Sequence, residues 1–300
     1  MLRLLNCYLP FGPLLRSIGI PVSVRWPTLL LVLGAIHCLG TLYDAFANEP
    51  WLYSLEEEHS LFWSGAYSAS LRPFPLPNVV AETTLWQAFI GWNLSGSLGL
   101  LFMGLLHLMS GSSLHVALTF LTCIIIWCYA LIVLLYFFYL PALVLLVAAV
   151  GATLDLTGRK ISHPYHGLSL SSVVSTFGPV PLLLAGVSHL IVALGYPRVF
   201  APIDRIPFRK LSEIFLRLPA SFGCQTTFWQ VYVGSAIING LACCAISTHT
   251  FLILNSKTSS QSLIILCRGG GLLLLLISLS YSLWMPKLVT ATFLICLFLK

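Results

Sequence analysis

The sequence predicts an all-α integral membrane protein, a helical bundle of about eight transmembrane helices built as two parallel four-helix repeats. Of its 300 residues, 58% are hydrophobic and 8% are charged, whereas a soluble domain carries about 25% charged residues. Several apolar stretches also reach the roughly 20 residues that a helix needs to cross the hydrocarbon core of a bilayer. An internal sequence repeat predicts the two units.

The apolar stretches give the order of the expected spans. The stretch at residues 114–154 is too long for one crossing, so we divide it near Tyr139 and Pro141. The expected spans are residues 26–46, 84–109 and the two parts of 114–154 in the first half, and 178–196, 228–254, 262–283 and 285–299 in the second. The predicted organisation is a surface segment (1–25), a first repeat (26–157), a linker (158–177) and a second repeat (178–300).

The internal repeat is clearest at the start of the second span of each half. Residues 83–91 (TTLWQAFIG) align with residues 226–234 (TTFWQVYVG), with five of nine positions identical and the other four apolar in both. Further landmarks recur in the same order, a histidine in each first span and a proline at the start of each last span: His37 and His189, Pro141 and Pro286. This order predicts a tandem duplication. Because each copy has an even number of spans, the copies would share one orientation.

One segment carries a family resemblance. Residues 86–95 (WQAFIGWNLS) fit the pattern Trp-x-x-aromatic-x-Gly-aromatic-Asn-x-Ser, and Leu98 and Gly99 follow them. This pattern resembles the second helix of a family of small uncharacterised bacterial four-helix membrane proteins. The resemblance covers roughly residues 27–153 and implies a four-helix unit without a known activity. The second half departs from it, because Ser235 and Ala236 stand where the aromatic residue and the asparagine would be.

Strongly polar side chains inside a span are costly and mark candidate functional sites. The candidates for an intramembrane polar site are His37, Asn93, Ser95, His189 and Arg268. At about 1.5 Å per residue, His37 and Asn93 lie at a similar depth below one membrane face, so they can meet across an antiparallel helix pair. Such a contact is either a hydrogen bond that fixes packing or a polar pocket for a headgroup, a quinone or a proton path. Arg268 is either a side chain that reaches to the interface or a buried anion contact.

We expect no cofactor, no metal and no catalytic residue. The nine cysteines include no Cys-x-x-Cys pair, so a zinc site is not indicated. A haem needs two axial ligands at one depth, whereas His107 lies at the opposite end of its span from Asn93, the residue level with His37. The sequence also lacks Gly-x-Ser-x-Gly, Walker and His-Glu-x-x-His motifs.

The loops suggest contacts at the membrane surface. Residues 207–218 place apolar side chains on one helical face and basic ones, such as Arg209 and Lys210, on the rest, which predicts an amphipathic surface helix. The corresponding loop of the first half carries Glu56 to Glu58, so the two loops could pair. Seven basic residues fall on each side of the expected membrane, and the orientation therefore stays open. The expected partners are membrane lipid and a membrane protein or further copies of the chain, without nucleic acid. The expected location is the cell (plasma) membrane.

Three functions fit the sequence. The first is a non-enzymatic membrane protein, either a structural or assembly factor or a carrier of a lipid or small solute. The second is a membrane-embedded enzyme that acts on a lipid-like substrate through a polar pocket at His37 and Asn93. The third is a secondary transporter with a site between the repeats, which predicts broken helices in corresponding positions. Prolines occur only at the ends of the expected spans, which counts against the third and favours the first.

Overall fold

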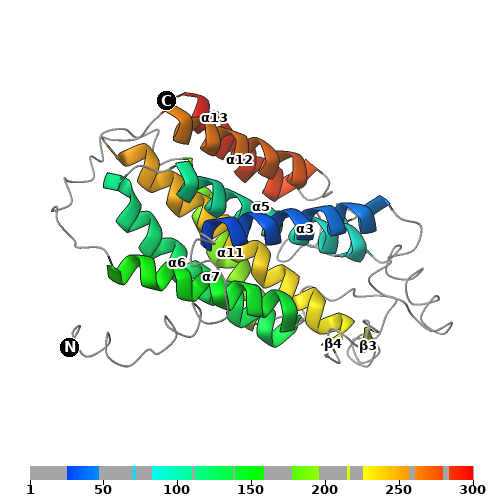
Figure 1. Ribbon diagram of the computed structural model, residues 1–300. Helices are drawn as coiled ribbons and strands as arrows, with labels where there is room; N and C mark the ends of the chain where they lie inside the picture. Colours follow the sequence, from blue (N-terminus) through cyan, green and yellow to red (C-terminus); the bar gives the residue numbers. More distant parts are fainter. Residues whose placement is uncertain are drawn as a thin grey trace, which may run out of the picture.

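The computed structural model of the chain describes residues 26–46, 70–71, 83–109, 112–137, 139–158, 178–195, 215–216, 226–256, 261–279 and 284–299. Apart from four two-residue strands, the secondary structure of these residues is helical (Figure 1). The first half contains α3 (Trp26–Phe46), β1 (Ser70–Leu71), β2 (Thr83–Thr84), α5 (Leu85–Met109), α6 (Ser112–Tyr136) and α7 (Tyr139–Gly158). The second half contains α9 (Pro179–Gly195), β3 (Phe215–Leu216), β4 (Thr226–Thr227), α11 (Phe228–Asn255), α12 (Gln261–Leu279) and α13 (Trp284–Phe298). The predicted all-α class is confirmed.

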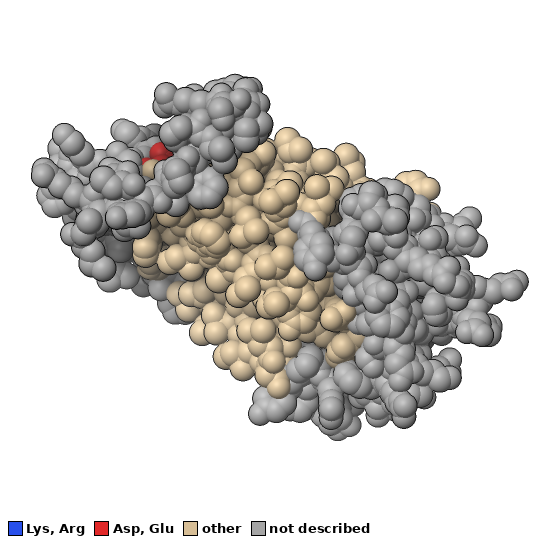
Figure 2. Space-filling view, turned by 60° about the horizontal axis from the view of Figure 1, so that its bottom comes forward, with Lys and Arg blue, Asp and Glu red and all other residues tan. Residues whose placement is uncertain are grey.

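The described helices form an integral membrane bundle. Five of them, α3, α5, α6, α11 and α12, are long and apolar enough to cross a membrane, and α7, α9 and α13 are shorter apolar helices. Many large apolar side chains point outward, including Leu39, Leu135 and Ile191, each more than half exposed. Figure 2 shows a described surface that is almost entirely uncharged. Water would not solvate such a surface, and lipid hydrocarbon does.

The helix boundaries follow the prolines and polar residues of the sequence. The predicted division of the long apolar stretch is confirmed, since α6 ends at Tyr136 and α7 begins at Tyr139. Pro141 lies in the first turn of α7, where a missing N–H breaks no helical hydrogen bond. The described helix α12 ends at Leu279, and residues 280–283 of the predicted span lie outside the described residues.

Two short hairpin pairings precede the long second helix of each half, and the sequence analysis did not predict them. Ser70 pairs with Thr84 in the first half, and Phe215 pairs with Thr227 in the second. The β-branched threonines favour the extended backbone. The prediction of an amphipathic helix through residue 218 is therefore wrong at Phe215 and Leu216, which form β3. The rest of that segment, the acidic loop, the N-terminal segment and most of the linker lie outside the described residues.

The helices of the two halves interlock. The second helices, α5 and α11, pack against each other at the centre, and α3 covers α5 as α9 covers α11. The third helix of each half also packs across the boundary, α6 on α11 and α12 on α5. The last two helices of each half also form matching pairs, α6 with α7 and α12 with α13. Figure 1 shows the α12–α13 pair and the α6–α7 pair on opposite sides of the central helices.

Two glycines bring the first helix of each half close to the second. A Cβ at Gly34 of α3 would lie 3.1 Å from the backbone oxygen of Ser97, and a Cβ at Gly186 of α9 would lie 3.0 Å from that of Gly240. Side chains at these positions would separate the helices, so glycine sets both interhelical distances.

Candidate functional site

His37 forms a packing bond between α3 and α5. Its Nδ1 atom lies 2.7 Å from the hydroxyl of Ser97, and this hydroxyl donates to the backbone oxygen of Asn93 at 2.9 Å. Because a hydroxyl has one proton to donate, the Ser97 oxygen accepts the second bond from the Nδ1–H of His37. His37 therefore contacts the residue one helical turn beyond Asn93.

Asn93 bonds across the centre of the bundle to the second half. It is buried, and its Nδ2 donates to the backbone oxygen of Phe89 at 2.9 Å. Its Oδ1 lies 3.2 Å from the hydroxyl of Ser235 of α11, which shares its one proton between Asn93 and the backbone oxygen of Val231 at 2.8 Å. Within the described helices, His37 and Asn93 therefore hydrogen-bond to different partners and not to each other. A similar depth along two helices does not decide which neighbour each helix face meets.

The other three predicted site residues have surroundings different from those of His37 and Asn93 and from one another. Ser95 is buried on α5. His189 of α9 packs edge-on against Trp92, with ring centroids 5.5 Å apart. Arg268 of α12 donates from Nε to the backbone oxygen of Leu297 at 3.0 Å. It also lies over the Phe298 ring, 5.0 Å from its centroid. Since the last carbonyls of a helix lack helical partners, Arg268 caps the end of α13.

A buried polar cluster that the sequence analysis missed joins both halves. The Nε2 atoms of His107 on α5 and His249 on α11 each lie 2.7 Å from the hydroxyl of Thr122 on α6. The His249 Nδ1 atom lies 2.6 Å from the backbone oxygen of Ala245. Exposure is 5% for His107 and 0% for both other side chains. We call His107, Thr122 and His249 the His–Thr–His chain.

The spacing of His107 and His249 in the sequence could have predicted that they lie close together. They lie 142 positions apart, close to the 143 positions that separate the aligned segments at the start of α5 and α11. Helices at corresponding places in two copies can meet on the axis between them, and residues at or next to equivalent positions then come together. At an offset of 143 the position equivalent to His107 is Thr250, which directly follows His249.

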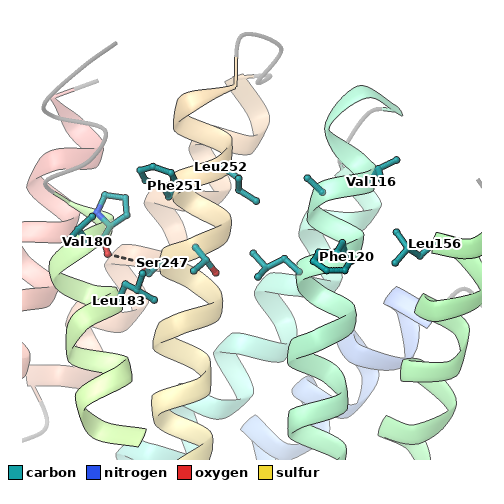
Figure 3. Close-up of a pocket in the computed structure, with 12 residues that line it drawn as sticks. Val116, Phe120, Leu156, Val180, Leu183, Ser247, Phe251 and Leu252 are labelled. Atoms are coloured by element: carbon teal, nitrogen blue, oxygen red, sulfur yellow. Dashed lines mark hydrogen bonds between the residues drawn. The ribbon is translucent and has the colours of Figure 1, made fainter. Parts of the chain in front are cut away.

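A groove of about 660 Å³ lies between the halves, bounded by α6, α7, α9 and α11 and partly open at the surface of the bundle. Figure 3 shows α6 with Val116 and Phe120 on one side, and α11 with Ser247 and Leu252 on the other. Its lining is almost entirely apolar and comes from Val116, Ala117, Phe120, Leu121, Leu156, Pro179, Val180, Leu183, Ser247, Thr248, Phe251 and Leu252. We call this cavity the α6–α11 groove.

The hydroxyls of the groove are used within the protein. Ser247 donates to the backbone oxygen of Pro179, and Thr248 donates to the backbone oxygen of Cys244 at 2.6 Å. These bonds leave the groove with hydrocarbon as its main contact surface. All of its lining lies near the start of α6 and α9 and near the end of α7 and α11. The groove therefore occupies one membrane side of the bundle.

The described residues contain no group of three or more His, Cys, Asp or Glu side chains that could hold a metal ion. The His–Thr–His chain offers two imidazoles whose facing nitrogens already share one hydroxyl. The His–Thr–His chain therefore links α5, α6 and α11 by hydrogen bonds. Comparisons with protein families, curated proteins and solved structures gave no match for this chain.

Proposed function

We propose that this chain is a non-enzymatic, multi-pass integral membrane protein that holds the hydrocarbon chain of a membrane lipid in the α6–α11 groove. The groove carries the proposal, because its volume of about 660 Å³ falls within the roughly 300–1,000 Å³ of ligand pockets. Because the lining is apolar and its Ser247 and Thr248 hydroxyls donate to backbone oxygens, the groove favours an apolar ligand. Filling the groove with methylenes adds packing contacts that an unfilled groove lacks.

The position of the groove favours a lipid over a soluble ligand. Phe120, which lines it, is 56% exposed, and Leu154 and Leu184 on the neighbouring α7 and α9 are more than half exposed. These side chains face the hydrocarbon of the bilayer. A lipid chain can therefore enter from the side without crossing water.

We also propose that the bundle is a tandem duplication whose eight helices cross the cell (plasma) membrane as two parallel units. The contacts of the first and last helices support this. Trp26 of α3 packs on Gly151 of α7, where a Cβ would lie 2.9 Å from the Trp26 Cβ. At the corresponding place in the second half, Gly178 lies beside Cys296 of α13, with a Cβ–Cβ distance of 2.7 Å for a substituted Gly178. In the first half the glycine belongs to the last helix, and in the second half it directly precedes the first helix. Such an exchange of the larger and the smaller residue is compatible with two diverged copies.

The enzyme and transporter hypotheses have less support. The enzyme hypothesis needs His37 and Asn93 in one pocket, and each has its own hydrogen-bond partner. The transporter hypothesis needs broken helices in both halves, whereas α5 and α11 run continuously over Leu85–Met109 and Phe228–Asn255. A carrier or lipid-binding role requires neither feature.

Photolabelling tests the proposed function. The protein is reconstituted in phosphatidylcholine vesicles that contain a trace of phosphatidylcholine with a diazirine in its acyl chain, and labelled peptides are identified by mass spectrometry. We expect labelling at the groove faces of α6 and α11. Ala117→Phe fills the groove and should remove most of this labelling. Ala35→Phe, a half-buried alanine of α3 outside the groove, is the matched control and should keep it. Equal labelling of the wild type and Ala117→Phe would contradict the proposal.

A further inference from the structure

The α6–α11 groove lies within one half of the thickness of a membrane. On α6 the lining runs from Val116 to Leu121, four to nine residues after the first residue of the helix. On α11 it runs from Ser247 to Leu252, three to eight residues before the last residue. At about 1.5 Å per residue, the lining is within roughly 14 Å of these helix ends. Half of a hydrocarbon core is about 15 Å thick, so the groove belongs to one leaflet.

The other two helices place the groove at the same depth. On α9 the lining runs from Pro179, the first residue of the helix, to Leu183, and on α7 it includes Leu156, two residues before the last residue. Figure 3 shows Leu252 near the end of α11 and Ser247 further from that end. The groove therefore begins close to the helix ends, at the level where acyl chains join their headgroups.

Close packing closes the groove towards the centre of the membrane. One helical turn beyond Leu183, Gly186 of α9 lies so near α11 that a Cβ there would be 2.9 Å from the Cys244 Sγ. At the same end of the groove, Ile126 of α6 and Ala245 of α11 are fully buried in one hydrophobic cluster. Helices packed this closely leave no space for a hydrocarbon chain between them. The groove is thus a blind pocket.

The groove is also closed towards the interior of the bundle. Thr122 of α6 and His249 of α11 lie directly behind the lining, with 2.7 Å between Oγ1 and Nε2, and both side chains are 0% exposed. Phe120 of the lining is instead 56% exposed. Along the described helices, the open directions are therefore sideways past Phe120 and towards the helix ends.

This shape decides which part of a lipid fits. In each leaflet the headgroups lie at the membrane surface, and the methyl ends of the chains meet at the centre. We propose that the α6–α11 groove binds lipids of a single leaflet, on the side where α6 begins, through the segment of an acyl chain next to its ester. The rest of the chain turns out past Phe120 into the bilayer. This inference rests on the proposed function and adds which lipids are bound, and by which part.

The bound segment also defines the chemical class of the ligand. A hydroxyl on the chain next to the ester would enter a lining that is almost entirely apolar, where it would lose its hydrogen bonds with water at a cost in free energy. A hydroxyl near the methyl end would stay outside the groove. The expected ligands are therefore acyl lipids with an unsubstituted chain next to the ester, whatever the length of the chain.

Two photoactive phosphatidylcholines test this inference. One carries a diazirine next to the ester of its acyl chain and the other near the methyl end, each as a trace in phosphatidylcholine vesicles that contain the full-length protein. The measured quantity is the labelling of α6 and α11 that Ala117→Phe removes, because contact with bulk lipid is unaffected by that change. Leu252→Trp fills the groove from α11 and serves if Ala117→Phe does not fold. Ile124, at the middle of α6 and 48% exposed, reports on bulk lipid and should react mainly with the methyl-end probe in every variant.

We expect the ester-proximal probe to give several-fold more groove labelling than the methyl-end probe. Groove labelling that is equal for the two probes, or stronger from the methyl-end probe, would overturn this inference and leave the proposed function standing. If filling the groove removes no labelling from either probe, the proposed function itself is contradicted.

Competition by unlabelled lipid tests the ligand class. Phosphatidylcholine hydroxylated near the methyl end should displace the ester-proximal probe from the groove as well as the unsubstituted lipid does. Phosphatidylcholine hydroxylated next to the ester should displace it several-fold less. Equal displacement by the two hydroxylated lipids would show that the groove does not hold the ester-proximal segment.

Discussion

The Ser235 hydroxyl lies 3.2 Å from the Asn93 side-chain oxygen, and this bond joins the two halves of the chain at the α5–α11 contact. Both atoms belong to buried side chains. The hydroxyl shares its proton with the backbone oxygen of Val231, 2.8 Å away. Asn93 lies two residues after the segment 83–91, and Ser235 directly follows the aligned segment 226–234 of the other half. The bond therefore links the first turns after these two segments.

A double-mutant cycle should show this pairing as an energetic coupling. Asn93→Leu and Ser235→Ala each remove one side of the bond, and we expect a coupling of about 0.6 kcal/mol, the average for such bonds inside membranes. The measurement is unfolding of the purified protein in detergent. Thr292→Val paired with Asn93→Leu is the control, because Thr292 is a half-buried residue of α13 whose hydroxyl donates to Leu288 of its own helix. A coupling no larger than that of the control pair would contradict the assignment.

The glycine contacts should be costly to fill in both halves. Gly34→Ile and Gly186→Ile place side chains where a Cβ already lies about 3 Å from the adjacent helix, and overpacking of this kind costs about 1–3 kcal/mol. Thermal unfolding in detergent measures the loss. Gly40→Ile and Gly195→Ile are the matched controls on the same helices, since a Cβ at either meets nothing within 4 Å. Equal losses at all four positions would refute the close packing.

The interlocked third helices predict that the two halves associate as separate chains. Residues 1–167 and 168–300, co-expressed with a tag on one, should purify together because α5–α11, α6–α11 and α5–α12 contacts all cross the boundary. Gly234→Ile should weaken this association, since its Cβ would lie 2.6 Å from the Tyr136 Cβ of α6. Gly195→Ile in the same fragment should not. Fragments that purify separately would count against an interlocked bundle.

The sequence alone predicted where the helices begin and end, but it did not predict which side chains of neighbouring helices are in contact. Residues such as Pro141 mark helix starts through local backbone chemistry, which depends on adjacent residues alone. The partner of Asn93 depends on how α5 and α11 are rotated about their axes, and that rotation follows from packing across the whole bundle. The α6–α11 groove left no signal, because side chains such as Leu121 that line a cavity have the same composition as side chains that face lipid.

Arg268 should stabilise the end of α13. Arg268→Met removes the bond to the Leu297 oxygen and the contact with the Phe298 ring, and we expect a loss of about 1–2 kcal/mol. Hydrogen exchange should become faster in the last turn of α13. Lys287→Met, at the start of the same helix, is the control and should leave that turn unchanged. Unaltered exchange in Arg268→Met would show that the cap is not stabilising.

The presence of a lipid chain between α6 and α11 is the central claim, and electron cryo-microscopy of the protein in phosphatidylcholine nanodiscs tests it most directly. We predict elongated density in the α6–α11 groove, in contact with Phe120 and Leu252, which Ala117→Phe abolishes and Ala35→Phe retains. A wild-type map in which α6 and α11 close on each other, with no density between them, would contradict it.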